Sequence, residues 1–266
     1  MSTSSEFFPG IQIIDTDTHW SEPHDLWTSG APARYRELVP QIKEHNGKRA
    51  WVVNGDIVLA GSSAVSAIAT DGEKIPGIRF LKHDIDSVHR SSFDCDERLA
   101  AMDEMGVSHC ITYPNVGGFG NQNFLKIDDR ELRVACVEIY NDYMADVQKR
   151  SGGRILPMAL VPWWDIDASV TEVERMAALG SRGVVMCSNP HDSGMPDFAQ
   201  PDWRPFWEAC EAMQMPVNFH IGASTGDIDW SGSVPYKTWP ADVRLTLGGA
   251  SIFVGNMRWM INLLAV

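Results

Sequence analysis

The sequence lacks closely spaced cysteines and is poor in positive charge. Its five cysteines are odd in number, widely separated and form no Cys-x-x-Cys motif, which argues against a disulfide framework or a structural zinc site. Lysine and arginine number 22 against 35 aspartates and glutamates, so the net charge is −13. Such a charge repels phosphate backbones and anionic membranes, and we therefore expect neither nucleic acid nor membrane as a partner. The cysteines are expected to be buried, reduced thiols.

Segments that target or anchor a protein are also hard to find. Residues 1–9 do not combine a basic region with an apolar run, the pattern typical of a secretory signal. The most apolar window, residues 248–266, is interrupted by Asn256, Arg258 and Asn262, and we interpret it as a buried helix instead of a membrane span. The sequence shows no repeat of fixed period, which argues against solenoids and propellers. Together these absences predict a cytoplasmic globular protein.

The sequence does contain an alternation of apolar strand-like segments and amphipathic helix-like segments. The predicted helices are long enough to serve as crossovers between parallel strands. This alternation predicts an α/β fold built from about five parallel βα units. A closed (β/α)8 barrel needs eight strands, so residues 1–266 are expected to form a single domain holding a partial TIM barrel, incomplete at its C-terminus. The predicted strands are residues 11–19, 108–113, 155–161, 183–187 and 217–221, and the predicted intervening helices are residues 96–105, 130–150, 169–179 and 202–213.

An insertion of about residues 40–95 is predicted between the first and second of these strands. Asn54-Gly55, the strongest short hairpin signal, lies between the β-type segments 49–53 and 56–60, so we expect a β-hairpin outside the parallel sheet. The helix that follows is predicted to be capped by Asp96 and to be closed by Gly106 in the left-handed conformation.

Three residues at predicted strand ends suit a metal ion. Asp17 and His19 stand one residue apart, so the two-residue period of a strand points both side chains to one face. A carboxylate and an imidazole both bind zinc or a similar divalent ion. His220 ends the fifth predicted strand, where barrel enzymes place their sites. The alternative interpretation is that Asp17 caps a turn while His19 and His220 pack in the core.

Three further residues follow predicted strands at the same barrel face. Asn115 and Asn189 come after the second and fourth strands, and Trp163 comes after the third. Barrel enzymes contact their substrates from this face, so we predict these residues to be substrate-binding. The alternative is that they cap loops and form turns.

Several stretches of the sequence carry a resemblance to a known enzyme family, and together they cover essentially the whole chain. They resemble the amidohydrolase superfamily, in particular the amidohydrolase-related proteins that include aminocarboxymuconate-semialdehyde decarboxylase. The matching stretches are Ile14-Asp15-Thr16-Asp17-Thr18-His19, Glu22-Pro23, Pro201-Asp202-Trp203, Pro216-Val217-Asn218-Phe219-His220-Ile221-Gly222 and Phe253-Val254-Gly255-Asn256-Met257-Arg258-Trp259.

The resemblance implies that Asp17, His19 and His220 hold one divalent metal ion, with Zn²⁺ favoured and Mn²⁺ or another ion as the alternative. The family commonly begins with His-x-His, so Asp17 is a departure that some of its branches share. The bridging lysine of binuclear relatives is absent, since Met-Cys-Ser occupies residues 186–188, and this favours one ion over two. The family's later catalytic histidine and metal-binding aspartate would lie beyond Val266, so the catalytic residues are not assigned.

The function expected from this resemblance is that of a metal-dependent hydrolase or a non-oxidative decarboxylase acting on a small organic acid. The ion would serve as a Lewis acid and as an activator of bound water. Hydrolysis and decarboxylation use the same ligands, so both stay open, with a slight preference for decarboxylation. The alternative function is a catalytically inactive truncated fragment or a binding module. The expected partner is a small-molecule substrate, and a homo-oligomer is left open.

Overall fold

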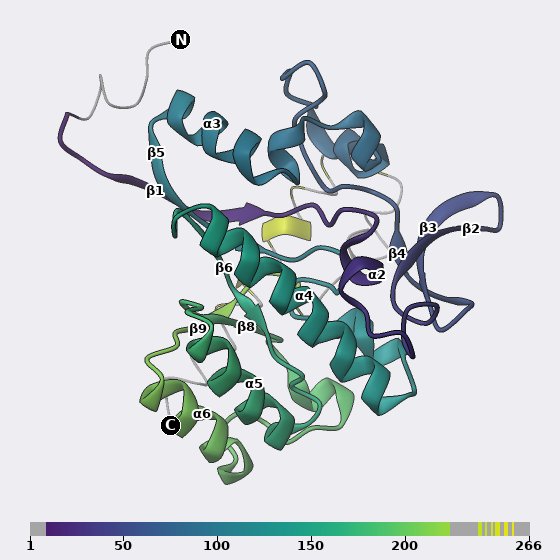
Figure 1. Ribbon diagram of the computed structural model, residues 1–266, viewed down its shortest axis with the longest axis vertical. Coiled ribbons are helices and arrows are strands. Elements are labelled where there is room, and N and C mark those ends of the chain that lie inside the picture. Colours follow the sequence, from purple (N-terminus) through teal and green to yellow (C-terminus); the bar gives the residue numbers. More distant parts are fainter. Residues whose placement is uncertain are drawn as a thin grey trace.

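The computed structural model describes residues 9–223, 239–240, 243, 246, 248–250, 253–254 and 257. Parallel strands run through the middle of this part of the chain and helices cover them, whereas a small antiparallel sheet stands apart at one end (Figure 1). The strands and α-helices are, in chain order, β1 (Ile13–His19), α2 (Leu26–Gly30), β2 (Gln41–His45), β3 (Lys48–Val53), β4 (Ile57–Gly61), α3 (Cys95–Met105), β5 (Val107–Tyr113), α4 (Arg130–Arg150), β6 (Ile155–Pro157), β7 (Ala159–Leu160), α5 (Ile166–Ala178), β8 (Val184–Met186), α6 (Arg204–Ala212) and β9 (Val217–Phe219). The described residues also form short 3₁₀ helices: η1 (Gly77–Lys82), η2 (Ile85–Ser87), η3 (Arg90–Ser92), η4 (Gln122–Lys126), η5 (Pro190–Ser193) and η6 (Pro201–Trp203).

The parallel strands form two ladders of three strands, ordered β1-β5-β6 and β7-β8-β9. β6 and β7 are the two halves of the predicted third strand. Met158 N donates to Thr112 O at 3.0 Å, whereas Ala159 N donates to Gly183 O at 2.9 Å, so the chain changes its hydrogen-bonding neighbour at this point. The five predicted strand positions follow one another in parallel. Among the described strands β1 and β9 do not pair, and barrel closure is not seen.

Helix boundaries follow from the capping residues. Asp94 accepts hydrogen bonds from the amides of Asp96 and Glu97 at 3.0 and 3.2 Å, so the prediction of Asp96 as the N-cap of α3 is wrong by two residues. Gly106 has a φ of 71° and ends α3 in the left-handed conformation, as predicted. Asp165 caps α5 through the amide of Ala168 at 3.1 Å, which starts this helix three residues earlier than the expected residue 169.

The insertion after β1 contains the expected hairpin and one strand more. β3 and β4 pair antiparallel around Asn54-Gly55, which confirms the predicted hairpin. β2 adds a third antiparallel strand that the sequence analysis did not include. It joins β3 through Asn46 and Gly47, whose φ angles of 52° and 73° are those of a tight hairpin turn.

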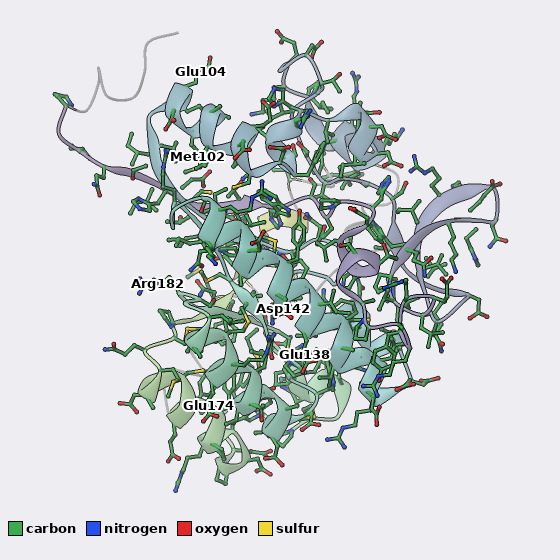
Figure 2. The ribbon with its side chains drawn as sticks, in the orientation of Figure 1. Met102, Glu104, Glu138, Asp142, Glu174 and Arg182 are labelled. Carbon is green, nitrogen blue, oxygen red and sulfur yellow. The ribbon has the colours of Figure 1, made fainter. Side chains whose placement is uncertain are left out.

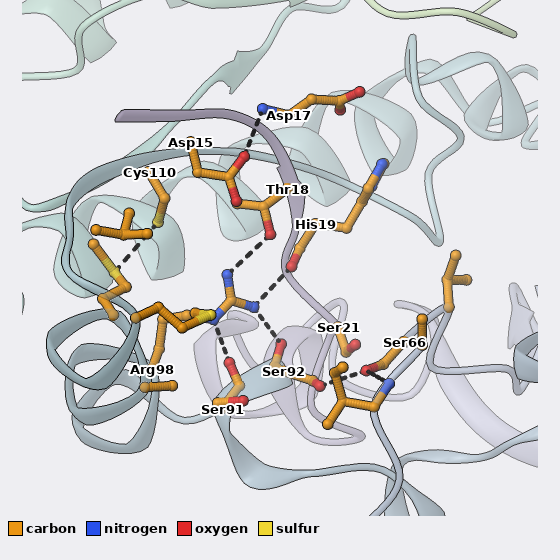
Figure 3. A pocket seen from close by; sticks show the side chains of 17 residues that line it. Asp15, Asp17, Thr18, His19, Ser21, Ser66, Ser91, Ser92, Arg98 and Cys110 are labelled. Atoms are coloured by element: carbon orange, nitrogen blue, oxygen red, sulfur yellow. Dashed lines mark hydrogen bonds between the residues drawn. The ribbon is translucent and has the colours of Figure 1, made fainter. Parts of the chain in front are cut away.

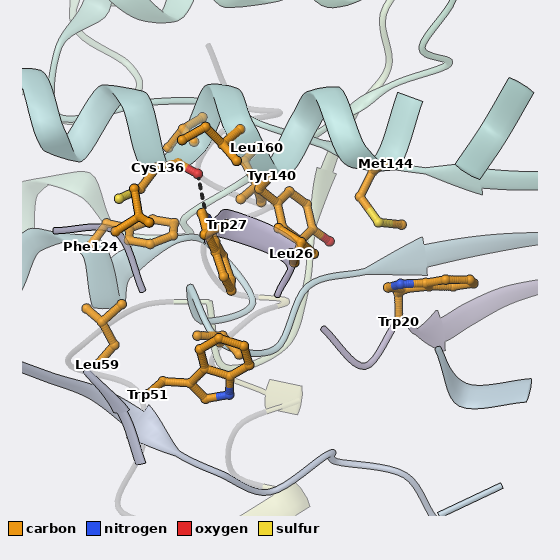
Figure 4. Close-up of a cluster of buried hydrophobic side chains, with 14 of the residues drawn as sticks. Trp20, Leu26, Trp27, Trp51, Leu59, Phe124, Cys136, Tyr140, Met144 and Leu160 are labelled. Carbon is orange, nitrogen blue, oxygen red and sulfur yellow. Dashed lines mark hydrogen bonds between the residues drawn. The ribbon is translucent and has the colours of Figure 1, made fainter. Parts of the chain in front are cut away.

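Two main hydrophobic clusters hold the helices onto the strands. In the first, Trp27 packs edge-on against Trp51 and donates its Nε1–H to the carbonyl of Cys136 at 2.9 Å (Figure 4). The second cluster contains Trp163, Trp203 and Phe206 and packs α5 and α6 against the strands. All five cysteines are buried and free, as expected from their spacing.

The outward faces of α4 and α5 carry acidic side chains, among them Glu138, Asp142 and Glu174 (Figure 2), and this agrees with the net charge of −13. Within the described ranges no helix combines the length and the apolarity that a membrane crossing requires. The predicted buried helix at residues 248–266 lies mostly outside the described residues.

Candidate metal centre

Asp17, His19 and His220 come together where β1 and β9 end. One ligand atom from each residue lies within 4.8 Å of the other two. His220 Nε2 lies 3.3 Å from Asp17 Oδ1, and the two imidazole rings are 4.9 Å apart between centroids. Figure 3 shows Asp17 and His19 near the end of β1, with the His19 side chain beside the ribbon. Asp17 and His220 differ strongly in exposure: the Asp17 side chain is 68% exposed and the His220 side chain only 7%.

Backbone carbonyls orient both imidazoles. His19 Nδ1 lies 3.2 Å from the Pro114 carbonyl, and His220 Nδ1 lies 2.7 Å from the Ile221 carbonyl. A carbonyl only accepts, so each Nδ1 carries a proton, and in the neutral ring the lone pair is then on Nε2. His220 Nε2 is buried and has no hydrogen-bond partner among the described residues. This nitrogen, the Asp17 carboxylate 3.3 Å from it and the second imidazole form a donor set that fits a divalent zinc or manganese ion.

The electrostatics keep His19 in the form that binds metal. Burial, together with the nearby His220 and Arg98, lowers the pKa of His19 to about 4, against the opposing influence of the Pro114 carbonyl and Asp17. His19 is therefore neutral at neutral pH. A neutral imidazole has no proton to release from Nε2 before an ion can bind.

Arg98 on α3 holds the end of β1 in place (Figure 3). Its guanidinium donates to Thr18 Oγ1 at 3.2 Å and to the His19 carbonyl at 2.9 Å, and its Nε donates to the Ser91 carbonyl. Burial lowers the pKa of Arg98. A cavity of about 310 Å³ lies beside these groups, with Asp15, Asp17 and Arg98 among its lining residues.

Phe119 is a residue of the site that the sequence analysis missed. Its ring packs on both imidazoles, with centroids 4.9 Å from His19 and 4.5 Å from His220. The loop that carries it is fixed, because the Gly120 carbonyl accepts from Trp163 Nε1 at 2.8 Å and Gln122 Nε2 donates to the Gly222 carbonyl at 3.1 Å. The signal in the sequence is a single aromatic residue among the glycines 117, 118 and 120, in the loop that follows a predicted strand.

The three predicted substrate residues are all buried. Asn115 donates its side-chain Nδ2 to the Trp20 carbonyl at 2.8 Å, and Trp163 is engaged with the Phe119 loop through Gly120. Asn189 is 3% exposed and directly precedes η5. Contact between these residues and a substrate stays a prediction.

Glu22, which the sequence shows only as part of the Glu22-Pro23 motif, is a second residue near the candidate site. Its side chain is buried and accepts hydrogen bonds from the amides of Asn115 and Val116. Burial raises the pKa of Glu22 to about 7, against the opposing influence of these N–H groups.

Comparison with known families places the fold and the site in context. An amidohydrolase family profile matches residues 14–250. The chain belongs to the amidohydrolase family. Its curated relatives include γ-resorcylate decarboxylases from Rhizobium radiobacter, 30% identical over 129 residues, and from a Rhizobium species, 29% identical over 129 residues. Each of these matches covers 47% of this chain and only 38% of the relative.

Solved amidohydrolase structures share the fold. An amidohydrolase from Mycobacterium avium subsp. paratuberculosis matches with a TM-score of 0.63 at 21% identity, over 91% of this chain and 68% of that one. A 5-carboxyvanillate decarboxylase from Novosphingobium aromaticivorans, complexed with manganese and a nitrobenzoic acid, matches with a TM-score of 0.51 at 19% identity, over 83% of this chain and 53% of that one. At these identities the likeness shows the mixed α/β fold of the family over part of its length.

Proposed function

We propose that this protein is a metal-dependent carboxy-lyase that releases carbon dioxide from a small aromatic acid. The observation that carries the proposal is the convergence of Asp17, His19 and His220 within 4.8 Å at the ends of β1 and β9. The γ-resorcylate decarboxylases among the relatives support the reaction, and the manganese in the 5-carboxyvanillate decarboxylase supports the class of ion. Hydrolysis of a small organic acid would use the same three ligands, and these relatives favour decarboxylation over it.

In this proposal Asp17, His19 and His220 hold one divalent ion, Zn²⁺ or Mn²⁺. A bound divalent ion supplies Lewis-acid stabilisation of the negative charge that develops on a substrate. The chain itself turns both imidazoles so that their Nδ1 atoms face the carbonyls of Pro114 and Ile221 and their Nε2 atoms are left for the ion. The Asp17 carboxylate contributes the negative charge that attracts the cation.

The surroundings of the centre are proposed to shape the substrate side. Phe119 covers one side of the two imidazoles, and the exclusion of water by its ring would strengthen electrostatic interactions within the site. Asn115, Trp163 and Asn189 are proposed to act from buried positions at the ends of successive strands, Trp163 through its bond to the Phe119 loop. We further propose that the parallel strands belong to a single barrel domain into which the β2–β4 sheet is inserted.

The test is metal binding followed by turnover. The metal-free 266-residue chain is titrated with Mn²⁺ and Zn²⁺, and the number of ions bound per chain is measured by elemental mass spectrometry. We expect one ion per chain, lost in His220→Ala and kept in the control His109→Ala, whose histidine lies on β5 outside the cluster. Release of carbon dioxide from 2,6-dihydroxybenzoate is then measured with the metal present. Retention of the ion by His220→Ala would refute the assignment, and binding without turnover would favour a metal-binding module.

A further inference from the structure

Glu22 is a buried carboxylate without a cationic partner. Only 5% of the residue is exposed, and within the described part of the chain no lysine, arginine or histidine forms an ion pair with it. Its Oε1 instead accepts from the backbone amides of Asn115 at 2.8 Å and Val116 at 3.0 Å. Burying an ionisable carboxyl in this way costs free energy, so its position calls for a reason beyond packing.

The reason lies at the other end of the same peptide group. The amide of Asn115 and the carbonyl of Pro114 belong to one planar unit, in which the N–H and the C=O point in opposite directions. Glu22 holds the N–H end, and the C=O end receives the Nδ1–H of His19 at 3.2 Å. Because the unit is rigid, fixing its N–H also fixes the direction of its carbonyl.

The neighbouring bonds tighten the same arrangement. Trp20 N donates to the Tyr113 carbonyl at 3.1 Å, and Asn115 Nδ2 donates to the Trp20 carbonyl at 2.8 Å. The segments after β1 and β5 are thereby joined beyond the last paired residues, His19 and Tyr113. An oxygen that accepts the N–H also polarises the peptide, which makes its carbonyl a stronger acceptor for the imidazole.

We propose that Glu22 is a positioning residue for His19. Through the Pro114–Asn115 peptide it fixes the carbonyl that receives Nδ1–H, and it thereby aims Nε2 of His19 at the metal centre. The inference rests on the proposed function, because it takes His19 to be a ligand. Groups that hold the distal nitrogen of a ligating histidine typically change metal affinity 10- to 100-fold when they are removed.

The experiment compares Mn²⁺ affinity and unfolding by urea in variants of the 266-residue chain. Glu22→Ala removes the acceptor and is expected to weaken Mn²⁺ binding about 10- to 100-fold, with a changed visible absorption spectrum when Co²⁺ replaces Mn²⁺. Glu22→Gln keeps an oxygen that can accept the same two amides, so its affinity and spectrum should stay close to those of the wild type. The matched control is Glu172→Ala, an equally buried glutamate on α5 that bonds Asn141 and Arg175. The Glu172→Ala variant should be less stable than the wild type but should bind Mn²⁺ with the same affinity.

The inference would be overturned by folded Glu22→Ala that binds Mn²⁺ as tightly as the wild type, or by Glu172→Ala that loses affinity to the same degree. If Glu22→Ala does not fold, Glu22→Asp decides, because it keeps the charge on a side chain one methylene shorter. Positioning predicts that Glu22→Gln binds Mn²⁺ more tightly than Glu22→Asp, and the reverse order would refute it. Failure of the wild-type chain to bind Mn²⁺ would instead refute the proposed function on which the inference rests.

Discussion

Replacement of Glu22 by glutamine should stabilise the metal-free protein, and the gain should depend on pH. The wild-type carboxyl is buried, and its partners within the described residues are N–H donors, among them the backbone amides of Asn115 and Val116 and the side chain of Asn115. A glutamine of the same shape offers an oxygen to the two backbone amides and carries no charge at any pH. The two proteins therefore differ chiefly in the free energy needed to ionise a buried carboxyl.

The size and sign of this effect follow from the pKa. Burial raises the pKa of Glu22 from 4.5 to about 7, so between these values the folded chain keeps a proton that the unfolded chain has released. The free energy of unfolding of the wild type therefore falls as the pH rises from about 4.5 to about 7, and this contribution is constant above and below that range. At about 1.36 kcal/mol for each tenfold change in proton affinity, the difference amounts to about 3 kcal/mol.

The assay is urea unfolding of both proteins in the presence of a chelator at several pH values from about 4.5 to 8. The advantage of Glu22→Gln over the wild type should grow by about 3 kcal/mol across this range, since the contributions of other titrating groups cancel in the difference. Glu104→Gln on the exposed face of α3 reports the effect of net charge alone. An advantage that stays constant with pH, or that grows toward acid pH, would refute the reasoning.

Two further predictions concern stability. Gly120→Ala should destabilise the fold by about 1–3 kcal/mol or more in urea unfolding, because a Cβ there would lie 2.3 Å from the Ala223 carbonyl oxygen. Gly61→Ala, where a Cβ meets nothing within 4 Å, is the control and should change stability little; equal effects would contradict the close packing of the Phe119 loop. Asp94→Ala should cost about 1 kcal/mol as the loss of an N-cap. In thermal unfolding, Asp96→Ala should lower the stability less than Asp94→Ala does. The opposite order would indicate that Asp96 is the N-cap of α3.

The parallel strands and the convergence of Asp17, His19 and His220 could be predicted because both have local signals. Apolar runs that end in polar residues mark the strands, and the period of two places Asp17 and His19 on one face. His220 was predicted from its place at the end of such a run. The three side chains then converge because the carboxyl ends of parallel strands share one edge of the fold.

Other features depend on contacts that a linear pattern does not encode. β2 is polar and partly exposed, so it has no apolar run, although Asn46-Gly47 is the same kind of hairpin signal as Asn54-Gly55. The change of neighbour at Met158 is hidden inside a continuous apolar segment. Glu22 acquires its role only when the chain brings Asn115, 93 residues away, to its side chain.

The two parallel ladders divide the candidate metal centre between them. Asp17 and His19 come from the ladder of β1, whereas His220 follows the last strand of the ladder that contains β9. The hydrophobic residues behind each ladder belong largely to separate clusters. An ion held by all three side chains would cross-link the two ladders. At a free concentration 100 times its Kd it would add about 2.7 kcal/mol to the free energy of unfolding, and neither ladder could then melt without releasing the ion.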